Sequence, residues 1–142
     1  MRLRVELPDT FLFTTTLPVR ITDLNYGGHL GNDALLSLLH EARVQFLAQL
    51  GAAEFDAVTR LGFIMADVAV EYKAEAFHGD VLRFELGARD LHKYGFDLGY
   101  RVSNQAGREV ARAKTGMLCF DYAARQLRRL PPELAARLAP MP

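Results

Sequence analysis

The chain contains a single cysteine among its 142 residues, no tryptophan and no excess of either charge. One cysteine allows no intrachain disulfide and no thiolate metal cluster within one chain. The 17 basic residues balance the 17 acidic residues, which argues against bulk electrostatic attraction to nucleic acid or to an anionic membrane. A local basic patch for a phosphorylated ligand is compatible with this balance.

Long apolar runs are also missing. The start, MRLRVELPDT, has no apolar stretch of the kind that signal peptides carry. No run approaches the roughly 18 residues of a membrane span, so we expect a cytoplasmic protein without a membrane segment. Because 50% of the residues are hydrophobic, we expect residues 1–142 to form one domain with a substantial core.

Hydrophobic periodicity predicts one long helix and five strands. From Asn32 to Leu50, apolar residues recur at three- and four-residue steps, and Gly51 is a natural stop for a helix. Alternation and enrichment in β-branched and aromatic residues predict strands at 11–19, 63–72, 81–89, 94–102 and 108–122. Pro131 and Pro132 can open a short helix over Glu133 to Leu138.

This order of elements predicts an α+β domain. A strand precedes the long helix, and four antiparallel strands follow it, so the sheet can wrap the helix on one face. One sheet around one helix leaves strand edges and the second face of the sheet poorly covered. Pairing with a second copy would cover them, and we expect a homo-oligomer.

Three stretches carry a resemblance to a known family, in the right order along the chain. They are VRITDLNYGGHLGNDALLSLLHEAR at 19–43, VEYKAEAFHGDVL at 70–82 and GREVARAKTGMLCFDYAARQLRRLPPEL at 107–134. Together they resemble the hotdog-fold thioesterases, in particular the 4-hydroxybenzoyl-CoA thioesterases and the short acyl-CoA thioesterases related to them. The resemblance covers nearly the whole chain.

The resemblance implies a hotdog fold, in which a five-stranded antiparallel sheet wraps a long central helix. It implies a homodimer, often paired into a tetramer, with active sites at the dimer interface near the N-terminus of the helix. The implied reaction is hydrolysis of an acyl thioester of coenzyme A, or less often of acyl carrier protein. We expect neither a cofactor nor a metal site.

The run TDLNYGGHLGND, at 22–33, is the predicted active-site segment. Backbone N–H groups at a helix N-terminus carry partial positive charge, and glycine lets a substrate approach the backbone closely. We therefore expect a main-chain N–H in the range Gly28 to Leu30 to polarise the thioester carbonyl, with Tyr26 lining the acyl pocket. The alternative is a glycine-rich turn and helix cap without a ligand.

Position 25 departs from the family pattern. The family has an aspartate there, the base or nucleophile in its best-known members, whereas this chain has Asn25. An amide has no accessible base function, although it can donate a hydrogen bond to a carbonyl or hold a water. The family mechanism therefore cannot be transferred to this position unchanged.

Three residues could compensate for the missing acid. Glu41 is the first choice, because it lies away from the apolar stripe of the helix, on a side that a second subunit can cover; the alternative is a solvated or salt-bridged glutamate. His29 could bind the carbonyl, orient a water or act as a base near neutral pH, or merely cap the helix. Asp23 is third, and bracing the turn is its more natural role.

Other polar residues have less specific signals. For the phosphates of coenzyme A, the candidates are Arg60, Lys73, Lys93 and Arg112, each of which could equally lie on a solvated face. We expect a surface role for His40, a salt bridge for Glu71 and a buried structural thiol for Cys119.

The first hypothesis is thus an acyl-CoA thioesterase, in which Asn25 and His29 position the thioester and Glu41 activates water. The second is a non-catalytic hotdog protein that binds acyl-CoA or acyl carrier protein, which the asparagine at position 25 favours. A hotdog dehydratase fits the Asp-x-Asn and Gly-His layout poorly. A nucleic-acid module is disfavoured by the neutral charge.

Overall fold

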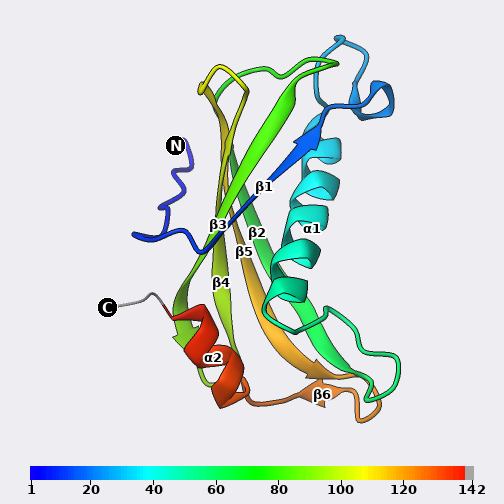
Figure 1. Cartoon of the computed structure of the whole chain (residues 1–142), viewed down its shortest axis with the longest axis vertical. Helices are drawn as coiled ribbons and strands as arrows, with labels where there is room; N and C mark the ends of the chain where they lie inside the picture. The colour runs from blue at the N-terminus through cyan, green and yellow to red at the C-terminus, as the bar shows by residue number, and fades with distance from the viewer. Residues whose placement is uncertain (140–142) are drawn as a thin grey trace.

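An antiparallel sheet curls around one long helix (Figure 1). The computed structural model describes residues 1–139. The strands are β1 (Phe13–Pro18), β2 (Leu61–Tyr72), β3 (Val81–His92), β4 (Gly95–Ser103), β5 (Glu109–Asp121) and the short β6 (Gln126–Leu127). The helices are α1 (Asn32–Gln49), α2 (Pro132–Leu138) and the 3-10 turn η1 (Ile21–Asp23). The strand order is β1-β3-β4-β5-β2, with β6 paired to β5. The predicted hotdog architecture is confirmed.

The largest local departure from the predicted strands lies in β2. The register against β5 shifts between Met65 and Asp67, where one extra residue enters β2. Ile64 pairs with Leu118 and Val68 pairs with Thr115, so these two side chains lie on opposite faces of the sheet. Unbroken alternation along the predicted strand 63–72 would place Ile64 and Val68 on one face, and this expectation is wrong across the bulge.

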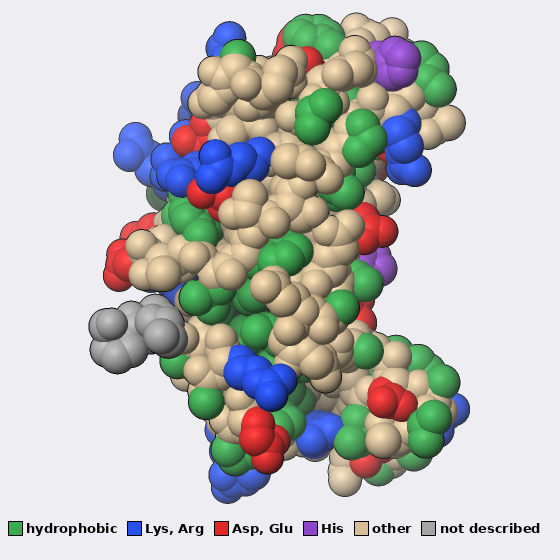
Figure 2. Space-filling view, viewed as in Figure 1, with side chains coloured by type: hydrophobic (Ala, Val, Ile, Leu, Met, Phe, Trp, Pro, Cys, Tyr) green, Lys and Arg blue, Asp and Glu red, His purple; other side chains and the backbone are tan. Residues whose placement is uncertain are grey.

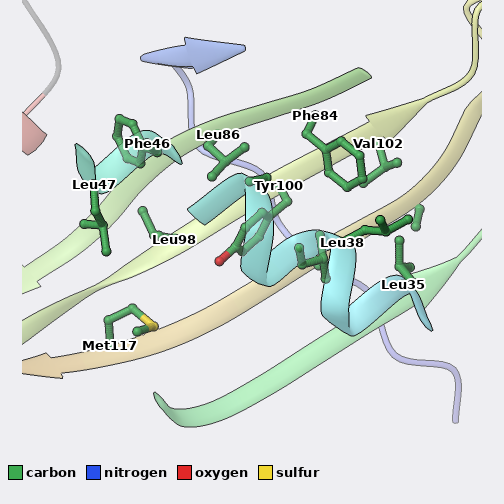
Figure 3. Close-up of a cluster of buried hydrophobic side chains, with 14 of the residues drawn as sticks. Leu35, Leu38, Phe46, Leu47, Phe84, Leu86, Leu98, Tyr100, Val102 and Met117 are labelled. Atoms are coloured by element: carbon green, nitrogen blue, oxygen red, sulfur yellow. The ribbon is translucent and has the colours of Figure 1, made fainter. Parts of the chain in front are cut away.

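The core fills the space between α1 and the concave face of the sheet (Figure 3). The apolar stripe of α1 is buried there at Leu35, Leu39, Ala42 and Phe46, together with Leu38 and Leu47, and its last member, Leu50, is partly buried. Strands β3, β4 and β5 supply large apolar side chains opposite the helix: Phe84, Leu86, Leu98, Tyr100, Val102 and Met117. At its C-terminal end α1 is followed by Gly51 with a φ of 75°, a conformation that glycine adopts without strain. The predicted end of the helix is thus confirmed.

The N-terminal segment lies against the outer face of the sheet. Leu86 and Tyr100 point toward α1, so their neighbours Gly87 and Gly99 face the opposite side. A Cβ atom on Gly87 would lie 2.3 Å from the carbonyl oxygen of Thr10, and one on Gly99 would lie 2.5 Å from Cδ of Pro8. The two glycines therefore make room for the N-terminal segment. The sequence analysis did not predict that this segment lies on the outer face of the sheet.

Candidate active site

The polar run before α1 forms a narrow loop that returns the chain to the helix N-terminus. Leu24 and Leu30 form an antiparallel bridge at its base, and Asn25 N–H donates to the carbonyl of His29 over 2.9 Å. Near the tip, Gly28 has a φ of 80°, which few other residues adopt without strain. Tyr26 projects from the tip and is fully exposed.

Asn25 and His29 lie together on either side of Gly27. Asn25 Oδ1 accepts the Gly27 N–H over 2.9 Å. A Cβ atom on Gly27 would lie 3.3 Å from Asn25 Oδ1 and 3.1 Å from His29 Nε2. His29 Nδ1 lies 3.3 Å from the carbonyl oxygen of Leu30, a contact that places the proton of a neutral ring on Nδ1. Nε2 is then free to accept a proton or a hydrogen bond.

Two of the three backbone donors that the sequence predicted are engaged within the chain. Gly28 N–H already donates to the carbonyl of Asn25 over 3.1 Å, and Leu30 N–H donates to the carbonyl of Ala76 over 2.8 Å. Both of these groups are engaged within the chain, so within the predicted range the N–H of His29 stays the predicted donor. Helix α1 offers further donors: Leu35 N–H makes the first bond of the helix, to Gly31 O over 3.1 Å, and the N–H groups of residues 32–34 precede it.

A small cavity of about 270 Å³ adjoins this end of α1. Its walls include His29, Leu30, Asn32, Leu35, Tyr72 and Val110. The hydroxyl of Tyr72 donates to the carbonyl of Asn32 over 3.0 Å. His29 and Leu30 thus line a pocket, as expected for site residues, whereas Tyr26 is not among the lining residues.

Asp33, which the sequence analysis did not single out, lies beside Asn25. A Cβ atom on Gly31 would lie 2.8 Å from Asp33 Oδ1 and 3.6 Å from Asn25 Cβ. Burial raises the pKa of the Tyr72 phenol, and the negative charge of Asp33 raises it further. Asp33 could have been noticed in the sequence as an acid in the first turn of the helix, next to the family motif.

Glu41 lies apart from these residues. It follows Asp33 by eight residues, which is about 12 Å along a helix axis. Its carboxylate accepts a hydrogen bond from Gln45 Nε2 over 3.0 Å, and it borders a different hollow, with Arg20 and Leu38. One chain does not bring Glu41 to Asn25 and His29, so its catalytic role stays a prediction that requires a second subunit.

Asp23 braces the loop, as expected. Its carboxylate is buried and accepts the backbone N–H of Arg20 over 2.8 Å and the Arg20 guanidinium over 3.1 Å. The hydrogen bonds from Arg20 hold the pKa of Asp23 below its usual value. With both oxygens engaged, Asp23 is a structural residue of the loop.

Two of the four predicted phosphate ligands lie together. Lys73 and Arg112 line a hollow of about 770 Å³ with Arg2 and Arg4 of the N-terminal segment. This hollow shares Tyr72 and Lys73 with the cavity beside His29. Figure 2 shows Lys and Arg side chains gathered in the region of the N-terminal segment.

The other two predicted phosphate ligands lie against aromatic rings. The Arg60 guanidinium is 5.8 Å from the centre of the Phe55 ring. Lys93 Nζ is 5.2 Å from the centre of the neighbouring Tyr94 ring. Neither residue borders the hollow that holds Lys73 and Arg112.

Residues 19–138 match the thioesterase-like superfamily. The chain belongs to this family. A 1,4-dihydroxy-2-naphthoyl-CoA hydrolase from Thermosynechococcus vestitus is 29% identical over 126 residues, which cover 87% of this chain and 86% of that protein.

Two solved structures illustrate the likeness of the fold. A 1,4-dihydroxy-2-naphthoyl-CoA thioesterase from Synechocystis superposes with a TM-score of 0.80 at 22% identity, over 89% of this chain and 94% of that chain. A gentisyl-coenzyme A thioesterase superposes with a TM-score of 0.81 at 19% identity, over 89% of this chain and 100% of that chain. These matches support the hotdog architecture described above.

In this thioesterase-like chain, the buried Arg43 at the end of the first motif forms an ion pair with Glu54 that the sequence analysis missed. Arg43 is buried in α1, where it donates to the Glu54 carboxylate and, over 3.2 Å, to the Tyr100 hydroxyl. His40 Nε2 lies 2.7 Å from Glu54 on the exposed side, so its predicted surface position is confirmed. This network ties α1 to the segment before β2 and to the sheet.

The remaining predictions concern Cys119 and Glu71. Burial raises the pKa of the Cys119 thiol to about 11, so it is protonated at neutral pH and the structural interpretation is confirmed. Glu71 forms the expected salt bridge, with Lys73 over 3.2 Å, and also accepts the Val5 N–H.

Metal and membrane features were sought in the described part of the chain. Among residues 1–139, no three His, Cys, Asp or Glu side chains are grouped so as to hold a metal ion. None of the helices in that range is long and apolar enough to cross a membrane.

Proposed function

We propose that this chain is an acyl-CoA thioesterase, which hydrolyses an acyl-CoA to the free acid and coenzyme A. The observation that carries the proposal is the cavity at the N-terminus of α1. In a chain of the thioesterase-like superfamily, this cavity combines His29, the free backbone donors of the first helical turn and a basic hollow next to it.

The thioester carbonyl would bind at the start of α1. N–H groups of the first turn point out of the helix end and carry partial positive charge, so they stabilise the oxyanion that forms when water attacks the carbonyl carbon. Asn25 and His29 would hold the carbonyl and the attacking water. Collapse of the tetrahedral intermediate breaks the carbon–sulfur bond and releases coenzyme A as its thiolate.

The acyl group would be small or aromatic. A volume of about 270 Å³ lies below the range of pockets that enclose drug-sized ligands, about 300–1,000 Å³. The two solved structures described above are, by their names, of enzymes that act on 1,4-dihydroxy-2-naphthoyl-CoA and gentisyl-CoA, and both of these acyl groups are aromatic. We therefore place aryl acyl groups first among the substrates and long acyl chains last.

The phosphates of coenzyme A would bind in the hollow of Arg2, Arg4, Lys73 and Arg112. Guanidinium groups match the geometry of phosphate oxygens. Because the hollow and the acyl cavity share Tyr72 and Lys73, one ligand could occupy both.

The enzyme would act as a homodimer that pairs through β2. This strand is one edge of the sheet, runs for 12 residues and exposes Met65, Val68 and Tyr72. Long apolar edges of this kind invite pairing with another strand. A dimer would also bring a partner's helix near the site, as the Glu41 prediction requires. A cytoplasmic location remains a prediction.

The decisive experiment tests hydrolysis of a panel of aryl, short-chain and long-chain acyl-CoAs, and it measures the release of the free thiol of coenzyme A. Turnover of aryl or short acyl-CoAs, lost in His29→Ala, would support the proposal. Val58→Ala, in an exposed loop, serves as the control. A folded protein that binds acyl-CoA without hydrolysing any member of the panel would instead establish the non-catalytic binding hypothesis.

A further inference from the structure

Asn25 leaves the site without a carboxylate at the position where the family pattern has one. The nearby chain supplies another. Gly31 lacks a side chain, and the space that its Cβ would occupy is 2.8 Å from Asp33 Oδ1 and 3.6 Å from Asn25 Cβ. The carboxylate of Asp33 and the side chain of Asn25 therefore both border the space beside Gly31.

We propose that Asp33 is the general base of this site; the proposal rests on the thioesterase function given above. A water held between Asn25 and Asp33 attacks the carbonyl carbon and transfers its proton to the Asp33 carboxylate. When the carbon–sulfur bond breaks, the leaving thiolate of coenzyme A takes that proton. No further reactant is needed, and the carboxylate is regenerated in each cycle.

The other nearby carboxylates are less suited to this step. Asp23 is buried and both of its oxygens accept hydrogen bonds from Arg20. Glu41 is bonded to Gln45 and lies about 12 Å farther along α1. Asp33 is exposed to solvent, and within residues 1–139 its carboxylate has neither a salt bridge nor a side-chain hydrogen bond. It is therefore free to hold a water.

Tyr72 lies near both Asp33 and the cavity beside His29. The Tyr72 hydroxyl is bonded to the carbonyl of Asn32 over 3.0 Å, and the charge of Asp33 is close enough to disfavour ionisation of that phenol. Tyr72 also lines the cavity with His29. Tyr72 thus connects Asp33, which is not itself among the lining residues, with the cavity that His29 lines.

An acid in the first helical turn can also serve only to stabilise the helix. The two roles predict different kinetics. A base contributes to the chemical step, so Asp33→Asn should lower kcat by about 100-fold or more with little change in KM. A purely stabilising acid would lower the melting temperature of the variant and leave kcat of the folded enzyme nearly unchanged.

The test measures kcat, KM and melting temperature on the acyl-CoA that the wild type hydrolyses best. It compares Asp33→Asn, the exchanged pair Asn25→Asp with Asp33→Asn, and Glu133→Gln, which removes an acid from the first turn of α2, as a matched carboxylate-to-amide control. We expect Asp33→Asn to lose activity and Glu133→Gln to retain it. The exchanged pair should be at least about tenfold more active than Asp33→Asn, because it returns a carboxylate to position 25.

Two results would overturn the inference while leaving the thioesterase function intact. One is an Asp33→Asn variant that keeps kcat within about threefold of an active wild type. The other is an exchanged pair that folds but is as inactive as Asp33→Asn. The activity of the exchanged pair still tests the inference if the single variant Asp33→Asn folds poorly. An inert wild type would instead overturn the proposed function and this inference together.

Discussion

The hydroxyl of Tyr72, the last residue of β2, donates a hydrogen bond to the carbonyl of Asn32, the first residue of α1. The bond joins the edge strand to the helix end that carries the candidate active site. Tyr72 also borders both the acyl cavity and the basic hollow. The position of the site thus depends on the edge of the sheet.

Removal of this hydroxyl should affect catalysis more than folding. In Tyr72→Phe, loss of one hydrogen bond of about 1 kcal/mol should lower kcat/KM by roughly fivefold. The melting temperature should change little, because the side chain is partly exposed. Steady-state kinetics would check this, with Tyr94→Phe as the control. Equal kinetics for the two variants would contradict the role of Tyr72.

Asp23 should make the stability of the protein depend on acid pH. Its pKa is lowered by hydrogen bonds from Arg20, so its contribution is complete above the unfolded value of about 4 and is lost as pH falls through the lower folded value. Urea denaturation between pH 3 and pH 6 (roughly the span around that value) should show this loss in the wild type. Asp23→Asn should be less stable at pH 6 and lose less on acidification. A parallel pH dependence in both proteins would refute this account.

The buried pair of Arg43 and Glu54 should matter for stability. Arg43→Met keeps the volume but leaves the partly exposed Glu54 without its main partner, which should cost about 3 kcal/mol. Arg83→Met removes an exposed guanidinium from Glu85, whose carboxylate keeps Arg101 as its partner, and should cost less than about 1 kcal/mol. Chemical denaturation measures both changes. Similar losses in the two variants would show that burial of the pair is unimportant.

The dimer should form through the edge strand β2. Val68 is 40% exposed on that strand, and Val68→Glu would place a charge in the proposed interface, which should shift the protein to monomer in sedimentation experiments. Val58→Glu introduces the same charge in an exposed loop, where Val58 is 92% exposed, and should leave the assembly unchanged. A wild-type monomer, or a dimer that tolerates Val68→Glu, would argue against this interface.

The sequence predicted the elements well because each has a strong local signal. The apolar stripe of α1 and the glycine at position 51 define the helix without reference to the rest of the chain. The bulge in β2 has no such signal, since the register shift after Met65 depends on pairing with β5. The alternation rule therefore failed there.

The site was predicted less completely because it depends on contacts between distant segments. The hydrogen bond from Leu30 N–H to the carbonyl of Ala76 joins residues 46 positions apart, and no local sequence pattern predicts it. The proximity of Asp33 to Asn25 depends on the way the loop folds back over Gly31. Asn25 and His29 were found from the family motif, and the loop brings them together.

Gly87 and Gly99 have a consequence for substrate selection. These residues let Pro8 and Thr10 approach the outer face of the sheet, and the same N-terminal segment carries Arg2 and Arg4 to the hollow proposed for the phosphates. Affinity for the nucleotide would then depend on two positions that never touch it. Recognition of the carrier would thus be set by the N-terminal segment, apart from the chemistry at α1.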